Sequence, residues 1–281
     1  MSLFFLQLRG ELRKMFTRKR TYIGFAVFLL VELLVLIGFQ TPPAQRAFQR
    51  TLERAGYGFE EYFSGLTLAF EMLRWSILLL GALYLALVAG DVVSKEVEEG
   101  TMRMILCRPV SRVRILMVKY ISCIIYTFVL IFFIGITALI TALLWRGAGG
   151  LFVVSPAERI FALYDFGPGL VRYGGALVLL SLTLLTVTSL GFLLSCLNMK
   201  PAAATIITLS ILFMDMVFRS IPYFEDYRQY FLTTHMATWV NAFVSHVPTL
   251  QIVQDLAFLF GVNATLVIAG IAVFQGRDFK S

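Results

Sequence analysis

Long stretches without charged side chains divide this chain into candidate membrane spans. Residues 75–90 form a run of sixteen without a charge, and residues 120–145 form a run of twenty-six. A helix needs roughly 20 apolar residues to cross a bilayer, and these runs lack the alternation of barrel strands. The pattern predicts an all-α polytopic membrane protein, a single domain over residues 1–281 with six transmembrane helices. They fall at about residues 22–39, 73–93, 121–145, 174–197, 201–218 and 256–274.

The connections between these spans differ in character. Residues 3–16 and 95–119 predict amphipathic cytoplasmic segments at the membrane face. Residues 44–70 predict a surface-lying external helix, and residues 220–253, which are rich in aromatic side chains, predict short external helices. Residues 146–173 contain several glycines and prolines, so we expect an external loop there.

Composition supports a membrane protein and argues against several other classes. The chain is 59% hydrophobic and 15% charged, whereas soluble domains average about 25% charged residues. The net charge of +7 is explained by basic residues beside spans, so we expect no nucleic-acid partner. Cys107, Cys123 and Cys196 show no disulfide or zinc spacing. His235 and His246 alone offer too few donors, so no metal site is predicted, although these histidines leave that alternative open.

The charged segment 95–119 separates two of the apolar runs and has an ordered pattern. Glutamates precede Gly100 and Thr101, and arginines and Lys119 follow them. Met102, Ile105, Leu106 and Pro109 have the spacing of one apolar helical stripe. Pro109 should end that helix near Arg108, and Ser111 is a natural N-cap for the next one. The segment therefore predicts a helix, a break and a second helix.

This segment resembles the signature of the ABC-2 type permeases, the membrane subunits of ATP-binding-cassette transporters. The similarity is to the six-span kind that includes the copper-enzyme maturation and gliding-motility permeases. The resemblance implies that the loop is a coupling segment that contacts a separate ATPase subunit, with the apolar stripe docked in a groove of that partner. The coupling residues would be Glu96, Glu98, Glu99, Gly100, Thr101, Met102, Ile105, Leu106, Pro109, Ser111, Arg112 and Lys119.

A second and weaker ATPase contact is implied at the turn before the fifth span. Ser195, Leu197 and Ala203 are similar to a family pattern there, and the turn itself contains Asn198, Lys200 and Pro201. The sequence has no Walker lysine motif. We therefore expect no catalytic site and no cofactor on this chain, with ATP and Mg²⁺ held by the partner. A second permease copy or a paralogue, and the lipid bilayer, complete the expected partners.

Basic residues set the expected orientation. Fifteen lie on the side of the N-terminus and nine on the other side, so the positive-inside rule predicts cytoplasmic termini. With the resemblance, this implies a multi-pass protein of a prokaryotic plasma membrane, acting in export.

Two acidic residues are candidates for a substrate path. Glu32 lies near the middle of the first span, where a charge costs about 2.5–3.5 kcal/mol on insertion scales, so it should face protein or water. Asp215 lies near the outer end of the fifth span. An ion-coupled secondary transporter, with Glu32 as a proton site, and a membrane-embedded enzyme remain alternatives.

Overall fold

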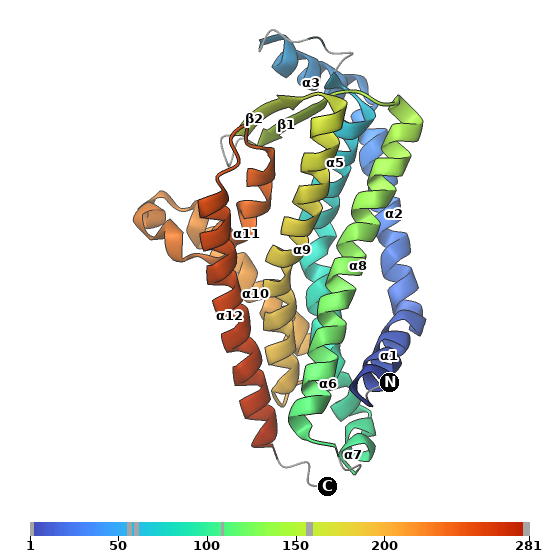
Figure 1. The fold of residues 1–281 in the computed structure, drawn as a ribbon, viewed down its shortest axis with the longest axis vertical. Coiled ribbons are helices and arrows are strands. Elements are labelled where there is room, and N and C mark those ends of the chain that lie inside the picture. The colour runs from blue at the N-terminus through green and yellow to red at the C-terminus, as the bar shows by residue number, and fades with distance from the viewer. Residues whose placement is uncertain (1–2, 55–57, 59–61, 108–109, 156–159, 278–281) are drawn as a thin grey trace.

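The computed structural model describes residues 3–54, 58, 62–107, 110–155 and 160–277, and it confirms the all-α membrane fold. Six apolar helical segments in this part of the chain are long enough to cross a bilayer (Figure 1). They are α2 (Lys19–Phe39), the continuous segment Gly65–Glu98, α8 (Arg112–Arg146), α9 (Phe166–Cys196), α10 (Pro201–Ser220) and α12 (Thr249–Gln275).

The second span is longer than hydropathy predicts. It consists of α5 (Gly65–Ser76), a π-helical turn η1 (Ile77–Gly81) and α6 (Ala82–Glu98), whereas the sequence predicted residues 73–93. Polar side chains such as Thr67, Asp91 and Glu96 are buried near its ends, so apolar content underestimates its length. The fourth span is likewise extended toward its start, from Gly174 back to Phe166.

Helix α9 is the most buried of the six spans and contacts α6, α8, α10 and α12. Small and hydroxyl-bearing side chains permit this close packing. A Cβ atom added to Gly191 would lie 2.9 Å from the Cβ of Ala89 on α6. The hydroxyls of Thr188 and Thr127 lie 2.8 Å apart between α9 and α8.

The end of the bundle opposite α7 contains a β-hairpin within the segment, residues 146–173, where the sequence predicted an external loop. Strands β1 (Leu151–Ser155) and β2 (Ile160–Tyr164) pair antiparallel, with Leu151 opposite Tyr164. The prediction was wrong because glycines before and after the strands masked a short apolar pattern whose side chains pack on the bundle. The helix predicted within residues 44–70 is α3 (Pro42–Arg54), and its Phe48 ring packs 5.2 Å from that of Phe152 on β1. The prediction was wrong for residues 65–70, which are buried in α5 at the start of the second span.

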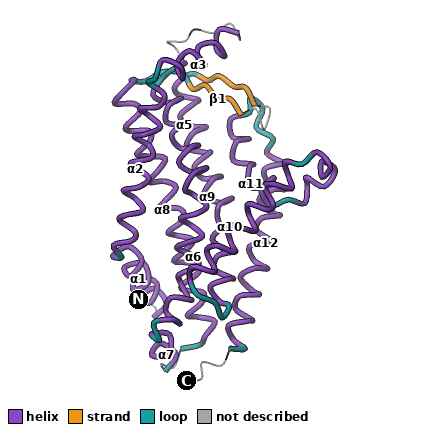
Figure 2. Tube along the Cα trace, turned by 180° about the vertical axis from the view of Figure 1, so that it is seen from behind, coloured by secondary structure: helices purple, strands orange, loops and turns teal. Residues whose placement is uncertain are grey.

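Short helices connect α10 to α12, as predicted, and the last of them packs against α9. They are η2 (Pro222–Tyr230), α11 (Leu232–Met236) and η3 (Ala237–Phe243). At the opposite end, α1 (Leu3–Thr17) and α7 (Thr101–Leu106) lie at the same end of the molecule as the C-terminal end of α12 (Figure 2). The segments predicted to be cytoplasmic therefore gather at one end of the molecule.

Candidate functional site

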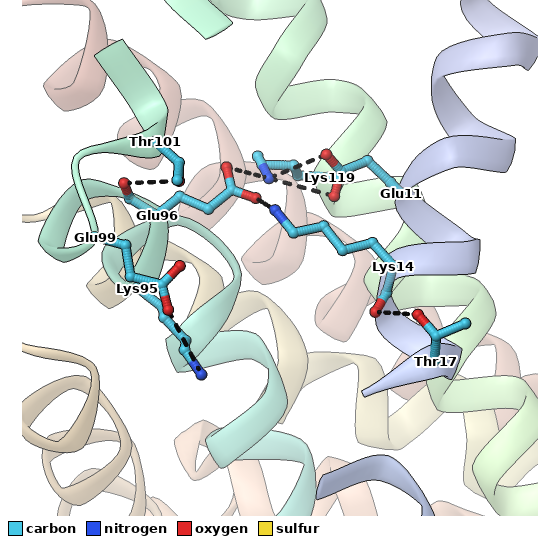
Figure 3. Close-up of polar contacts among 8 residues, drawn as sticks. All are labelled: Glu11, Lys14, Thr17, Lys95, Glu96, Glu99, Thr101 and Lys119. Carbon is cyan, nitrogen blue, oxygen red and sulfur yellow. Dashed lines mark hydrogen bonds and ion pairs between the residues drawn. The ribbon is translucent and has the colours of Figure 1, made fainter. Parts of the chain in front are cut away.

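A buried lysine joins three helices at the end of the bundle where α7 lies (Figure 3). Lys119, near the start of α8, is only 1% exposed. Its Nζ atom lies 2.7 Å from Glu96 Oε2 on α6 and donates at 3.3 Å to both carboxylate oxygens of Glu11 on α1. Lys14, also on α1, donates to the other oxygen of Glu96. We call Glu11, Lys14, Glu96 and Lys119 the four-charge cluster.

The cluster fixes the start of the predicted coupling helix. Gly100, with φ of 72°, turns the chain between α6 and α7, a conformation that glycine adopts without a steric penalty. The Thr101 hydroxyl then donates to the Glu96 carbonyl at 3.2 Å. A Cβ atom at Gly100 would meet nothing within 4 Å. Within this chain, the glycine is therefore required by its positive φ and not by a close neighbour.

The apolar side chains of α7 do not form the one exposed stripe that the sequence predicted, because they point to different sides of the helix. The Met102 side chain is fully buried in this chain's own core, so the expectation that it docks into a partner was wrong. It packs inward because α7 lies against the end of α6. Met104 is 67% exposed and Ile105 is half-buried. Pro109 and the side chain of Leu106 lie outside the described residues.

An open, mostly apolar groove lies between α1, α7 and the start of α8. Its volume is about 460 Å³, and its lining residues are Gln7, Gly10, Glu11, Thr101, Met104, Ile105, Val110, Ile115 and Val118. Ser111 forms the predicted N-cap beside it, accepting from the amide of Arg114 at 3.3 Å. The carboxylate of Glu11 therefore belongs both to the four-charge cluster and to the groove.

The two predicted coupling segments lie at the same end of the bundle. Glu98, at the end of α6, and Lys200 and Pro201, before and in α10, line one hollow of about 470 Å³. Glu98 and Glu99 are exposed, with Lys95 only 3.9 Å from Glu99.

The chain's C-terminal segment braces the same end of the bundle. Arg277 donates to Asn198 Oδ1 at 2.7 Å, and Arg112 donates to the carbonyl of Arg277 at 2.8 Å. Partial burial lowers the pKa of the Arg277 guanidinium, which remains charged at physiological pH.

The two candidates for the substrate path, Glu32 and Asp215, have different surroundings. Glu32 on α2 is buried and faces protein, as predicted, where it accepts from the Thr137 hydroxyl of α8 at 2.9 Å. Its second oxygen has no hydrogen-bond partner among the described residues. Asp215 accepts from the amides of Leu232 and Thr233 at 3.1 and 2.8 Å. It therefore stabilises the first turn of α11.

The histidines lie apart from any cluster of metal donors. Among the described residues, no group of three or more histidine, cysteine or acidic side chains could hold a metal ion. His235 instead contacts Asp255 at 2.7 Å and the Gln229 carbonyl at 2.8 Å.

Sequence reasoning missed Glu11 and Lys14 as partners of the coupling segment. Both lie in the amphipathic segment predicted over residues 3–16, and its expected place at the same membrane face as residues 95–119 is the signal that could have identified them. Their pairing joins residues 108 and 82 positions apart, and local patterns say nothing of such contacts.

Nearly the whole chain matches one family of known proteins. Residues 8–279 match the family described as ABC-2 family transporter protein. The chain belongs to the ABC-2 transporter family. It is also 30% identical over 89 residues to the uncharacterized protein YhcI of Bacillus subtilis (strain 168). That match covers 32% of this chain and 27% of the relative, so the chain spans about a quarter of the length of that relative.

The four-charge cluster predicts a stability difference between two lysines of this ABC-2 protein. Lys119→Met should lower the midpoint of thermal unfolding in detergent by about 5–10 °C, because it leaves buried carboxylates without their main cation. Lys95→Met is the matched control, since its exposed pair with Glu99 contributes at most about 1 kcal/mol. Adding Glu96→Gln to Lys119→Met should recover part of the loss. Equal midpoints for the two single variants would refute the structural role of the cluster.

Proposed function

We propose that this chain is the permease subunit of an ATP-driven exporter and that it couples to a separate ATPase subunit. Membership of a transporter family gives the class, and the four-charge cluster is the observation that supports the coupling. Its ion pairs join α1, α6 and α8, and α7 is linked to it through the hydrogen bond from the Thr101 hydroxyl to the Glu96 carbonyl. A force applied to α7 would therefore pass through the end of α6 to the cluster and from there to α8.

The groove between α1, α7 and α8 is the proposed docking surface for the ATPase. Met104 and Ile105 offer apolar surface on α7, and Glu11 offers an acidic group at the edge. The hollow that contains Glu98 and Lys200 is the proposed second contact. ATP and Mg²⁺ would bind to the partner, whose closure would tilt the helices as rigid bodies.

The substrate path would lie between two permease subunits, either two copies of this chain or this chain and a paralogue. Glu32 is a candidate for that path, because one carboxylate oxygen is buried and unpartnered among the described residues. Asp215 is a weaker candidate, because its contacts with Leu232 and Thr233 give it a structural task. The same buried Glu32 is the one observation that favours the alternative of an ion-coupled secondary transporter.

Orientation follows from the distribution of basic residues. We place both termini and α7 in the cytoplasm of a prokaryote, with the hairpin and α3 outside its plasma membrane, because fifteen of the 24 basic residues fall in the sequence segments 1–20, 95–119, 200 and 277–280.

The docking proposal predicts loss of ATPase capture when α7 becomes charged. Met104→Asp with Ile105→Asp should weaken binding of the co-expressed ATPase by roughly 100-fold, because two apolar contacts are replaced by carboxylates. The measurement is a pull-down of the ATPase with tagged permease at graded concentrations. Phe161→Asp, an exposed apolar position on β2, is the control at the opposite end and should bind normally. Undiminished capture by the double variant would rule out this docking surface.

Orientation can be measured with an impermeant thiol reagent on intact cells. In a Cys107→Ser background, which removes the exposed native cysteine, Gln49→Cys on α3 should label from outside. Glu99→Cys beside α7 should label only after the membrane is permeabilised. The reverse labelling pattern would place α7 outside and would remove the basis of the ATPase contact.

The conservative variant Glu32→Gln distinguishes a role of Glu32 in the substrate path from a role in packing alone. Glu32→Gln retains an acceptor for Thr137, so its unfolding midpoint should stay within about 2 °C of the parent, whereas Glu32→Leu should be lower. If Glu32 acts in the path, Glu32→Gln should nevertheless change ATP hydrolysis by the reconstituted complex at least several-fold. Parental hydrolysis in Glu32→Gln would leave Glu32 as a packing residue.

A further inference from the structure

A short arm projects sideways from the bundle between α10 and α12. The arm is η2 (Pro222–Tyr230), and it lies within the orange segment of Figure 1 that extends past α12; the reverse view in Figure 2 shows the same projection. Tyr223, Tyr227 and Tyr230 are 82%, 57% and 66% exposed. Three large aromatic side chains are thus presented away from the protein.

The arm is fixed to the bundle at both of its ends. Phe224 packs inward, with its ring 5.4 Å from that of Phe218 on α10. After the arm, Thr233 is held by Asp215 and by Arg219, which donates to its carbonyl at 3.0 Å. His235 contacts the Gln229 carbonyl at 2.8 Å. The backbone that bears the exposed tyrosines is therefore held in place by contacts with the bundle.

The lengths of α10 and α12 give the height of the arm, measured along the membrane normal. Helix α10 has 20 residues between Pro201 and Ser220 and is about 30 Å long, which is the thickness of the hydrocarbon core. Its first turn is near the C-terminal end of α12, because Arg277 donates to Asn198.

Helix α12 gives the same height independently. Its Asp255 contacts His235 at 2.7 Å. From Asp255 to the end of α12 at Gln275 the distance is again about 30 Å. Both helices therefore place the base of the arm one hydrocarbon thickness from the end that bears the four-charge cluster.

The side chains change character at this height. On α10 below the arm, Phe213, Met214 and Val217 are exposed and apolar, which suits acyl chains. On the arm, tyrosines alternate with Glu225, Asp226 and Arg228. Charged groups are costly in hydrocarbon, whereas tyrosine, with an apolar ring and a polar hydroxyl, is enriched at the membrane–water boundary.

We propose that η2 lies in the lipid headgroup layer of the leaflet opposite the four-charge cluster, with Tyr223, Tyr227 and Tyr230 in contact with lipid. The arm anchors the junction of α10, α11 and α12 at that surface. The proposed lipid contact of the arm requires only that the six helices span a membrane, and it does not depend on the proposed ATPase contact.

Spin-label depth measurements on the intact chain in phosphatidylcholine–phosphatidylglycerol nanodiscs test the assignment. In the Cys107→Ser background, a nitroxide is attached at Tyr227→Cys or, as a second site, at Tyr230→Cys. Collision rates are measured with oxygen, which concentrates in hydrocarbon, and with a neutral nickel chelate, which concentrates in water. Phe213→Cys on α10 and Gln49→Cys on α3 serve as the hydrocarbon and water references.

The expected result is an oxygen-to-nickel ratio at both arm sites between those of the two references. A ratio equal to that of Gln49→Cys would place the arm in water and overturn the proposal. Exclusion of both reagents would also overturn it, because a second copy or another protein would then cover the arm. Each labelled variant must elute as the parent does on size exclusion, and the two arm sites must agree.

Discussion

Burial of the Lys119 ammonium group constrains the end of the bundle on which the proposed coupling depends. A buried charge is destabilising by several kcal/mol unless opposite charges surround it. Glu96 and Glu11 supply those charges from α6 and α1. Consequently α1 must lie against α8, and α6 must continue until Glu96 reaches Lys119. The turn at Gly100, the inward Met102 and the groove beside Ile105 all follow from that placement.

The sequence predicted what depends on local pattern. Six spans, the surface helix α3 and the Ser111 cap were evident from apolar runs, amphipathic spacing and cap chemistry. The sequence did not predict the features that depend on contacts between segments far apart in the chain. The hairpin is fixed to the bundle by a distant segment of the chain, because the Thr67 hydroxyl on α5, 85 positions away in the sequence, accepts from the Phe152 amide at 2.8 Å. Glu11 is likewise explained only by Lys119, which lies on another helix. The docking role of α7 stays a prediction.

Polar residues inside the bundle form hydrogen bonds within their own helices. In a protein interior a hydroxyl can bond to the carbonyl one helical turn before it, as Ser181 does to Leu177 at 2.8 Å and Thr208 does to Ala204 at 2.8 Å. Such groups are satisfied locally and need no water. Hydropathy nevertheless counts them as polar. A span rich in serine and threonine, such as α9, can therefore be the most buried of the six.

The two ends of the second span are held in different ways, and this bears on how a displacement of α7 would travel. The second half, α6, ends in the four-charge cluster. The first half, α5, is held by Ser64 and Thr67, whose hydroxyls donate to the Gly150 carbonyl at 2.6 and 3.2 Å. Between them, the π-helical turn Ile77–Gly81 interrupts the regular backbone ladder, and such turns are locally weaker than α-helix. On the proposed mechanism, α6 would move with the cluster while α5 stays with the hairpin, so bending would concentrate at η1.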